Sequence, residues 1–278
     1  MELASRLSIS YYREIAPINE AHRVFLTRHT ESGKFFVKKL LTVYHAEIYR
    51  ALLSSPMPGM PRIYALHEEN GVLTVIEEYI SGDTLEETLA RSAEGGVSEA
   101  FAVDVTRQLC DILLPLHERK PPIVHRDIKP SNIMLTPSGK VFLLDFNAAR
   151  NVLPEKAEDT PLLGTRGFAA PEQYGFGSSG AGAGIYALGI VLRTMLGDVT
   201  VSPFLAHIVK KCTRMDARAR YRSVRSLKRA LRSPLCAGGR RAFLRIACGV
   251  ALGGLLLFLL AKFAAWVLFV LRIVHSIA

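Results

Sequence analysis

Residues 125–132 read H-R-D-I-K-P-S-N, and D-F-N at 145–147 begins thirteen residues after Asn132. The carboxylate of Asp127 can orient a substrate hydroxyl and accept its proton, and Lys129 can neutralise charge on a phosphoryl group in transit. Asn132 and Asp145 offer the hard oxygen ligands that Mg²⁺ prefers. Two carboxylates, a lysine and an amide at these spacings therefore indicate transfer of a metal-bound phosphoryl group.

This stretch resembles the catalytic loop of protein kinases almost letter for letter, and D-F-N resembles their D-F-G motif with asparagine replacing glycine. G-T-R-G-F-A-A-P-E at 164–172 is similar to the end of the kinase activation segment. Lys129 and Thr165 match the pattern of kinases directed at serine and threonine. The resemblance implies a Hanks-type (eukaryotic-like) serine/threonine protein kinase of the membrane-anchored bacterial type, which uses ATP and Mg²⁺ to phosphorylate a protein hydroxyl.

The resemblance covers roughly residues 10–232 and implies an α+β, two-lobed fold. A small β-rich lobe is expected at 1–80 and a larger helical lobe at 81–232. Ser98 is expected to cap a helix that ends at His117, because apolar residues recur every three to four positions between them. D-A-R-A-R-Y-R-S at 216–223 resembles the kinase motif D-P-x-x-R-P-x-S, which implies that Arg220 is the buried partner of Glu172.

The same resemblance assigns the nucleotide-binding residues. It places Lys38, in F-F-V-K-K-L (35–40), as the strand lysine that holds the α- and β-phosphates, with Lys39 on the opposite strand face. Glu47 is the only acidic residue between positions 32 and 67, so it is the predicted helix carboxylate that pairs with Lys38. Backbone groups from Glu78 to Ile80 are predicted to hold the adenine edge.

The remaining predicted roles concern the metal, the catalytic pair and one buried acid. Asn132 and Asp145 are expected to hold Mg²⁺, and Asp127 and Lys129 are the expected catalytic pair. The resemblance places Glu77 at the back of the adenine pocket. A buried carboxylate there needs a partner, for which Lys38 and water are candidates.

Three positions depart from the kinase pattern. The expected phosphate lid has no glycine between Ile15 and Leu26, although bare backbone usually covers the phosphates. Asn147 replaces the D-F-G glycine, and asparagine is the residue that best tolerates the positive φ available to glycine there. Gly184 replaces an aspartate that kinases use to support the catalytic loop. These departures favour the alternative of a pseudokinase, a membrane-bound scaffold or nucleotide-binding module.

Charge and hydropathy separate the end of the chain from its body. Residues 1–200 carry 20 lysines and arginines against 24 acidic residues, whereas residues 201–278 carry 15 against 1. Residues 233–245 read as a basic juxtamembrane linker, and the apolar run at 246–271 reads as a single transmembrane helix with one charge, Lys262. The basic flank predicts an N-terminal domain in the cytoplasm, lying against the anionic leaflet of the cell membrane.

The tail also leads to hypotheses about partners. Gly249 and Gly253 form the small-residue spacing that permits close pairing of membrane helices, so a homodimer is possible. Cys236 and Cys248 are candidate acylation sites. A small-molecule kinase is a further alternative, but the G-T-R-G…A-P-E segment argues for peptide substrates. Nucleic acid is not an expected partner, because the adjacent lipid explains the basic charge.

Overall fold

The computed structural model describes residues 7–92, 96–152, 165–174, 180–197 and 201–232. The chain divides into two compact units, Met1–Arg232 and Ser233–Ala278. The predicted basic linker, membrane helix, Gly249/Gly253 pair and candidate acylation sites lie outside the described residues. No helix within the described ranges is both long and apolar enough to cross a membrane.

The first half of the described chain forms an antiparallel sheet of five strands in the order β1-β2-β3-β5-β4. Its strands are β1 (Tyr12–Asn19), β2 (Val24–His29), β3 (Phe35–Leu41), β4 (Ile63–Glu69) and β5 (Val72–Glu78). One face of the sheet carries a small core of Phe36, Ala65 and Ile76, against which Tyr12 packs. The short helix α2 (Ala46–Ser54) contacts β4 and buries Ile48, Tyr49 and Leu52.

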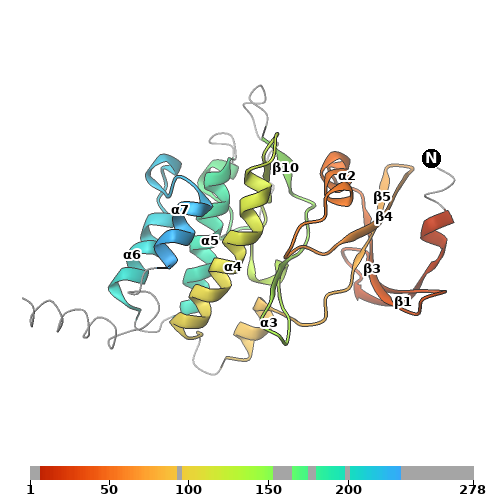
Figure 1. The fold of residues 1–278 in the computed structure, drawn as a ribbon, viewed down its shortest axis with the longest axis horizontal. Coiled ribbons are helices and arrows are strands. Elements are labelled where there is room, and N and C mark those ends of the chain that lie inside the picture. The colour runs from red at the N-terminus through yellow and green to blue at the C-terminus, as the bar shows by residue number, and fades with distance from the viewer. Residues whose placement is uncertain (1–6, 93–95, 153–164, 175–179, 198–200, 233–278) are drawn as a thin grey trace, which may run out of the picture. The chain divides into compact units, whose positions relative to one another are not determined.

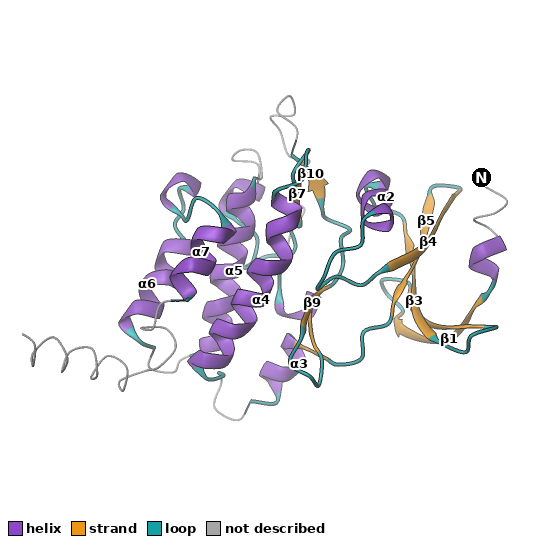
Figure 2. Ribbon diagram, viewed as in Figure 1, coloured by secondary structure: helices purple, strands orange, loops and turns teal. Residues whose placement is uncertain are grey.

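The second half is mainly helical, and Figures 1 and 2 show its helices gathered apart from the five-stranded sheet. The helices are α3 (Leu85–Ala90), α4 (Glu99–His117), α5 (Ala181–Leu196), α6 (Pro203–Cys212) and α7 (Val224–Leu231). Ser98 caps α4 by accepting a hydrogen bond from the Phe101 amide, which confirms the predicted start of this helix. Helix α4 packs against both α5 and α7 and contributes much of the core.

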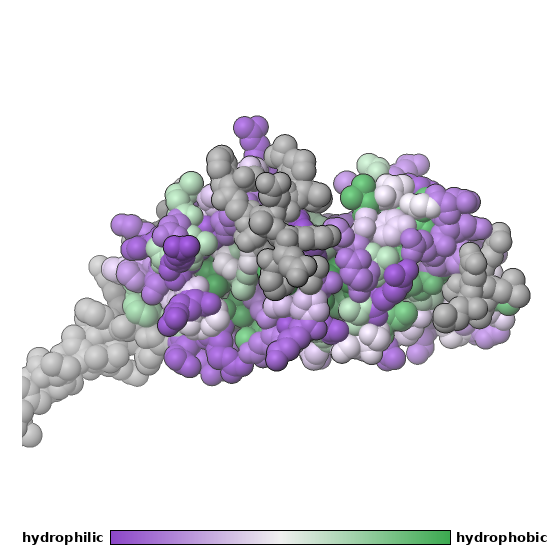
Figure 3. Space-filling view, turned by 90° about the horizontal axis from the view of Figure 1, so that it is seen from above, coloured by the Kyte–Doolittle hydropathy of each residue, from purple (hydrophilic) through white to green (hydrophobic). Residues whose placement is uncertain are grey.

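Two small sheets of short strands accompany the helices in the second half. Strands β6 (Asp83–Thr84), β8 (Ile133–Leu135) and β9 (Val141–Leu143) form one small sheet, and β7 (Ile123–Val124) pairs with β10 (Arg150–Asn151). The predicted division into a β-rich and a larger helical part is therefore confirmed. Figure 3 shows one face of the molecule, on which hydrophilic residues predominate and hydrophobic ones form small separate patches.

A buried ion pair joins two distant segments of the helical half. The guanidinium of Arg220 contacts both carboxylate oxygens of Glu172, at 2.7 and 2.8 Å. It also donates to the main-chain carbonyls of Gly182, Arg214 and Met215. The Arg220 side chain is fully buried, so this pair is the structural partnership predicted from the sequence.

Candidate active site

The β8–β9 hairpin brings two of the predicted polar residues to the same end of a small sheet. Ile133 of β8 pairs with Leu143 of β9, so Asn132 precedes one strand and Asp145 follows the other. The Leu144 amide donates to the Asn132 carbonyl at 2.8 Å, which continues the pairing beyond the strands. An amide and a carboxylate that are thirteen residues apart in sequence are thereby fixed at one end of this small sheet.

Asp127 lies at the centre of a hydrogen-bond network. Its Oδ1 accepts from the Thr165 amide at 3.2 Å and from Thr165 Oγ1 at 2.7 Å. Its Oδ2 accepts from Asn132 Nδ2 at 2.9 Å and lies 3.0 Å from Lys129 Nζ. Burial raises the pKa of Asp127, but the hydrogen bonds from Thr165 and Lys129 outweigh burial and leave the pKa below its usual 3.8. The side chain is therefore an oriented anion at neutral pH.

Thr165 connects the A-P-E segment to the catalytic loop. Besides donating to Asp127, its hydroxyl accepts a hydrogen bond from Lys129 Nζ at 2.8 Å. A second link comes from Gln173, whose Nε2 donates to the Arg126 carbonyl at 2.8 Å. Both contacts fix the position of the loop that carries Asp127.

The lysine of the nucleotide site was predicted to be Lys38, but the structure has its neighbour Lys39 in that place. Lys39, not Lys38, points toward Asp145, and its Nζ lies 2.7 Å from a carboxylate oxygen of Glu77. Lys38 Nζ instead contacts Glu14 at 2.8 Å on the other face of the sheet. The strand register explains the error: Val37 of β3 lies opposite Glu77 of β5, and Lys39, two residues further, shares that face as a diagonal neighbour.

The predicted pair between Lys38 and Glu47 is also wrong. Glu47 lies in the first turn of α2 with its side chain 56% exposed, and its carboxylate lies 3.7 Å from His45. The carboxylate that accompanies the buried lysine comes from the sheet, as Glu77. Strand β3 has apolar residues on both of its faces. The alternation of side chains along the strand therefore does not show which of the two lysines points into the site. The need of Glu77 for a partner was the usable signal.

A cavity of about 700 Å³ brings most of the polar groups together. Its lining includes Lys39, Asp127, Lys129, Asn132, Asp145 and Thr165. Pockets of this size accommodate ligands such as nucleotides. Lys38, Glu47, Glu78 and Ile80 do not line this cavity.

The turn between β1 and β2 supplies another part of the cavity wall. Asn19 Oδ1 accepts from the His22 amide at 3.1 Å, and the Arg23 amide donates to the Glu20 carbonyl at 3.0 Å. Arg23 has a φ of 52°, an uncommon conformation for a long side chain. Asn19, His22 and Arg23 all line the cavity, so polar and cationic side chains stand where glycines were expected.

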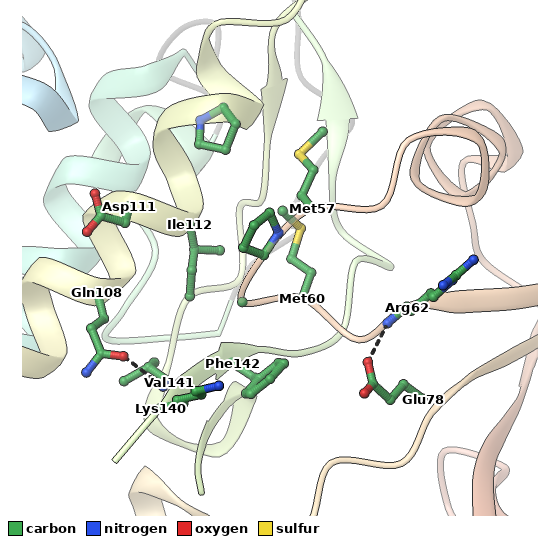
Figure 4. A pocket seen from close by; sticks show the side chains of 13 residues that line it. Met57, Met60, Arg62, Glu78, Gln108, Asp111, Ile112, Lys140, Val141 and Phe142 are labelled. Atoms are coloured by element: carbon green, nitrogen blue, oxygen red, sulfur yellow. Dashed lines mark hydrogen bonds between the residues drawn. The ribbon is translucent and has the colours of Figure 1, made fainter. Parts of the chain in front are cut away.

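Glu78 lies at the strand end that is predicted to join the two lobes. Its amide donates to the Arg62 carbonyl at 2.8 Å, so any contact of Glu78 with adenine has to come from its carbonyl oxygen. The Glu78 side chain accepts from the Arg62 amide and lines a separate cavity of about 710 Å³ (Figure 4). That cavity is walled largely by Met57, Met60, Ile112 and Phe142 and contains none of the catalytic-loop residues. Contacts of Glu78 and Ile80 with adenine stay a prediction.

The D-F-N motif is anchored by residues on either side. Phe146 packs edge-on against His125 at 4.7 Å, and His125 Nε2 lies 3.0 Å from the Leu144 carbonyl oxygen. Burial lowers the pKa of His125, which keeps the ring neutral in a structural role. The positive φ expected at Asn147 occurs instead at Asp145, with a value of 60°. Aspartate tolerates this region better than most residues. The conformation turns the Asp145 carboxylate away from the direction of the strand.

Asn147 has a role that the sequence did not reveal. Its Oδ1 accepts a hydrogen bond from the hydroxyl of Tyr49, the buried aromatic residue of α2. The helix is therefore linked to the segment that follows Asp145 through a tyrosine and an asparagine. A tyrosine at a helical core spacing carries no signal of such a contact.

Gly184 of α5 lies against the ring of His117. A Cβ atom at Gly184 would meet His117 Cε1 at 3.4 Å, so the ring fills the space beside the glycine. Burial lowers the pKa of His117 to about 4, which keeps this histidine neutral. The support expected from an aspartate at 184 is absent, and Gln173 provides one contact to the same loop.

The fold and the site define a protein kinase domain, and comparison with known proteins agrees. The protein kinase domain family matches residues 22–234, and the chain belongs to this family. This confirms the predicted family, whose members are phosphotransferases that act on proteins.

Three relatives illustrate the similarity. The serine/threonine-protein kinase PrkC of Bacillus subtilis is 33% identical over 54% of this chain and 24% of its own length. The serine/threonine-protein kinase PknA of Nostoc is 28% identical over 64% of this chain and 36% of its own length. Mitogen-activated protein kinase kinase 2 of Arabidopsis thaliana is 27% identical over 65% of this chain and 51% of its own length. The matched part thus spans about a quarter to a half of each relative.

Proposed function

We propose that the chain is an ATP-dependent serine/threonine protein kinase. The observation that carries the proposal is the convergence of Lys39, Asp127, Asn132 and Asp145 on one cavity. These groups are spread over more than a hundred residues of the sequence and have complementary tasks in phosphoryl transfer. Names of relatives from bacteria and plants support the same activity.

Each residue has a role that follows from its contacts. Lys39 is a buried cation able to hold nucleotide phosphates, since Glu77 and Asp145 keep it charged. Asp127 is fixed by Thr165 and Asn132, so it can orient the substrate hydroxyl and receive its proton. Lys129, beside both Asp127 and Thr165, can offset charge on the transferred group.

Asn132 and Asp145 fit the requirements of Mg²⁺. The Asn132 amide nitrogen donates to the main-chain oxygen and the carboxylate of Asp127, which leaves its Oδ1 as the atom for a cation. One carboxylate and one amide oxygen suit an ion that takes most other ligands from phosphates and water. Bound Mg²⁺ would neutralise charge on the phosphates of ATP.

Transfer of label from γ-³²P ATP tests this function in the full-length protein. We expect wild type to label itself or an added protein such as casein, and Asp127→Asn to lose at least about a hundredfold in rate. Phosphoamino-acid analysis should recover phosphoserine or phosphothreonine. No transfer by wild type in the presence of Mg²⁺ would contradict the proposal and favour the pseudokinase alternative.

The membrane tail belongs to the proposal as well. The apolar run at 246–271, preceded by basic residues at 233–245, supports one membrane-spanning helix with the kinase domain in the cytoplasm. Wild-type protein should stay in the membrane fraction after carbonate extraction, and Leu256→Arg with Leu257→Arg should release it. Release of the wild type would contradict anchoring. The predicted homodimer is tested by comparing the cross-linking of the wild-type protein with that of the double variant Gly249→Ile/Gly253→Ile.

A further inference from the structure

The lysine of the cavity is held by a residue of its own sheet. Lys39 of β3 and Glu77 of β5 lie on one face of adjacent strands, 2.7 Å apart, and their side chains are only 9% and 10% exposed. Diagonal neighbours on one face of an antiparallel ladder lie within reach of each other's long side chains. The position of the ammonium group is therefore determined within the sheet.

Helix α2 presents no carboxylate to this lysine. Its buried residues are Ile48, Tyr49 and Leu52, whereas Glu47 faces solvent beside His45. Turning Glu47 inward would require rotation of the helix and exposure of Tyr49, which is 1% exposed and bonded to Asn147. The helix contributes to the site through its tyrosine rather than through an acid.

The charges around Lys39 complete this arrangement. Glu77 forms the ion pair, and Asp145, the predicted metal ligand, is the second carboxylate that acts on the lysine. Glu77 therefore anchors Lys39 from one side while leaving Asp145 available for the cation. Glu77 accounts for the location of the lysine, and Glu77 and Asp145 together account for its charge.

We propose that Glu77 is the positioning residue for Lys39 in nucleotide binding, and that Glu47 has no part in it. This inference rests on the proposed kinase function. Its consequence is that the phosphate-holding lysine stays in place whatever the orientation of α2. Any regulation through that helix has to act on the Asp145 segment by way of Tyr49.

Binding of the fluorescent nucleotide mant-ATP with Mg²⁺ to the full-length protein in detergent tests the inference. We expect Glu77→Gln to raise the dissociation constant roughly 10- to 100-fold, because Lys39 loses its fixed position. Glu77→Asp, which keeps the carboxylate, should recover part of the affinity. The matched control Glu47→Gln should bind within about twofold of wild type.

A second comparison separates positioning from a general structural role. If Glu77 acts through Lys39, then Lys39→Met and Lys39→Met/Glu77→Gln should bind nucleotide equally weakly. A further loss in the double variant would overturn the inference, as would weak binding by Glu47→Gln together with normal binding by Glu77→Gln.

Folding and function are distinguished by two more measurements. If Glu77→Gln fails to fold, Lys39→Met/Glu77→Met removes both charges, and equal binding by this variant and Lys39→Met supports the inference, whereas unequal binding overturns it. A wild-type protein that binds nucleotide without transferring phosphate contradicts the proposed kinase function alone, because these binding comparisons still decide the role of Glu77.

Discussion

Asp127 has more hydrogen-bond donors than a simple base requires. Its two oxygens receive bonds from the amide and hydroxyl of Thr165, the Asn132 side chain and Lys129. These donors hold the carboxylate in one orientation and keep its pKa below the usual 3.8 even though burial alone would raise it. A weak base suits a reaction with a loose transition state, in which orientation of the hydroxyl matters more than early removal of its proton.

Glu77 predicts a pH dependence for nucleotide binding. Burial raises the pKa of Glu77 and Lys39 lowers it only in part, so the pKa lies above the usual 4.5. Burial also lowers the pKa of Lys39, but Glu77 and Asp145 raise it by more, so Lys39 stays charged. As the pH falls through the Glu77 pKa, the carboxyl becomes neutral and stops holding Lys39. As the pH is lowered, affinity for mant-ATP should therefore begin to decline while the pH is still above 4.5.

The same titration on Glu77→Gln provides the control. The pKa of Asp127 lies below this range, and His125, whose pKa burial lowers from 6.5, is another group facing Asp127 and Asp145. The acid decline should disappear in Glu77→Gln. Its persistence there would show that Glu77 does not control the lysine in this range.

At the scale of elements, α2 depends on its bond to the D-F-N motif. The helix has nine residues, a length at which tertiary contacts provide most of the stability. Tyr49→Phe removes the hydroxyl that donates to Asn147. We expect a loss of about 1 kcal/mol in the free energy of unfolding and a melting temperature lower by about 2–4 °C, measured by calorimetry.

Tyr44→Phe is the matched control for this change. The Tyr44 hydroxyl donates to Glu68 at 3.0 Å in an exposed position, so its removal should change stability by less than about 0.5 kcal/mol. Equal effects of the two substitutions would show that the link from α2 to Asn147 is no stronger than a surface contact.

At the scale of the whole molecule, the Arg220–Glu172 pair connects the A-P-E segment to the last helices of the described domain. Arg220→Met leaves Glu172 without its cation and removes the guanidinium donor from three carbonyls. Removal of one member of a buried pair costs about 3–5 kcal/mol. Urea unfolding of the full-length protein should show this loss, with Arg225→Met as the control.

Arg225 forms an ion pair with Glu118 in which both side chains are more than half exposed. Such surface pairs contribute about 0–1 kcal/mol, so Arg225→Met should unfold close to wild type. If Arg220→Met lost as little stability as Arg225→Met, the Arg220–Glu172 pair would not hold these segments together.

The sequence predicted the family, the helical half and the Asp127–Asn132–Asp145 group, because fixed spacing within one loop and one hairpin determines them. It failed at Lys38 and Glu47, where the outcome depends on which face of a strand meets another strand. Tyr49 and Gln173 were missed because their partners lie 98 and 47 residues away. Such contacts arise from packing and leave no local pattern.

The adjacent lysines offer the most direct test of the site. Phosphate transfer from γ-³²P ATP is measured for full-length Lys39→Met and Lys38→Met under identical conditions. The account predicts that Lys39→Met loses activity by at least about a hundredfold, whereas Lys38→Met, whose partner is Glu14, keeps activity close to wild type. Loss in Lys38→Met with full activity in Lys39→Met would contradict it.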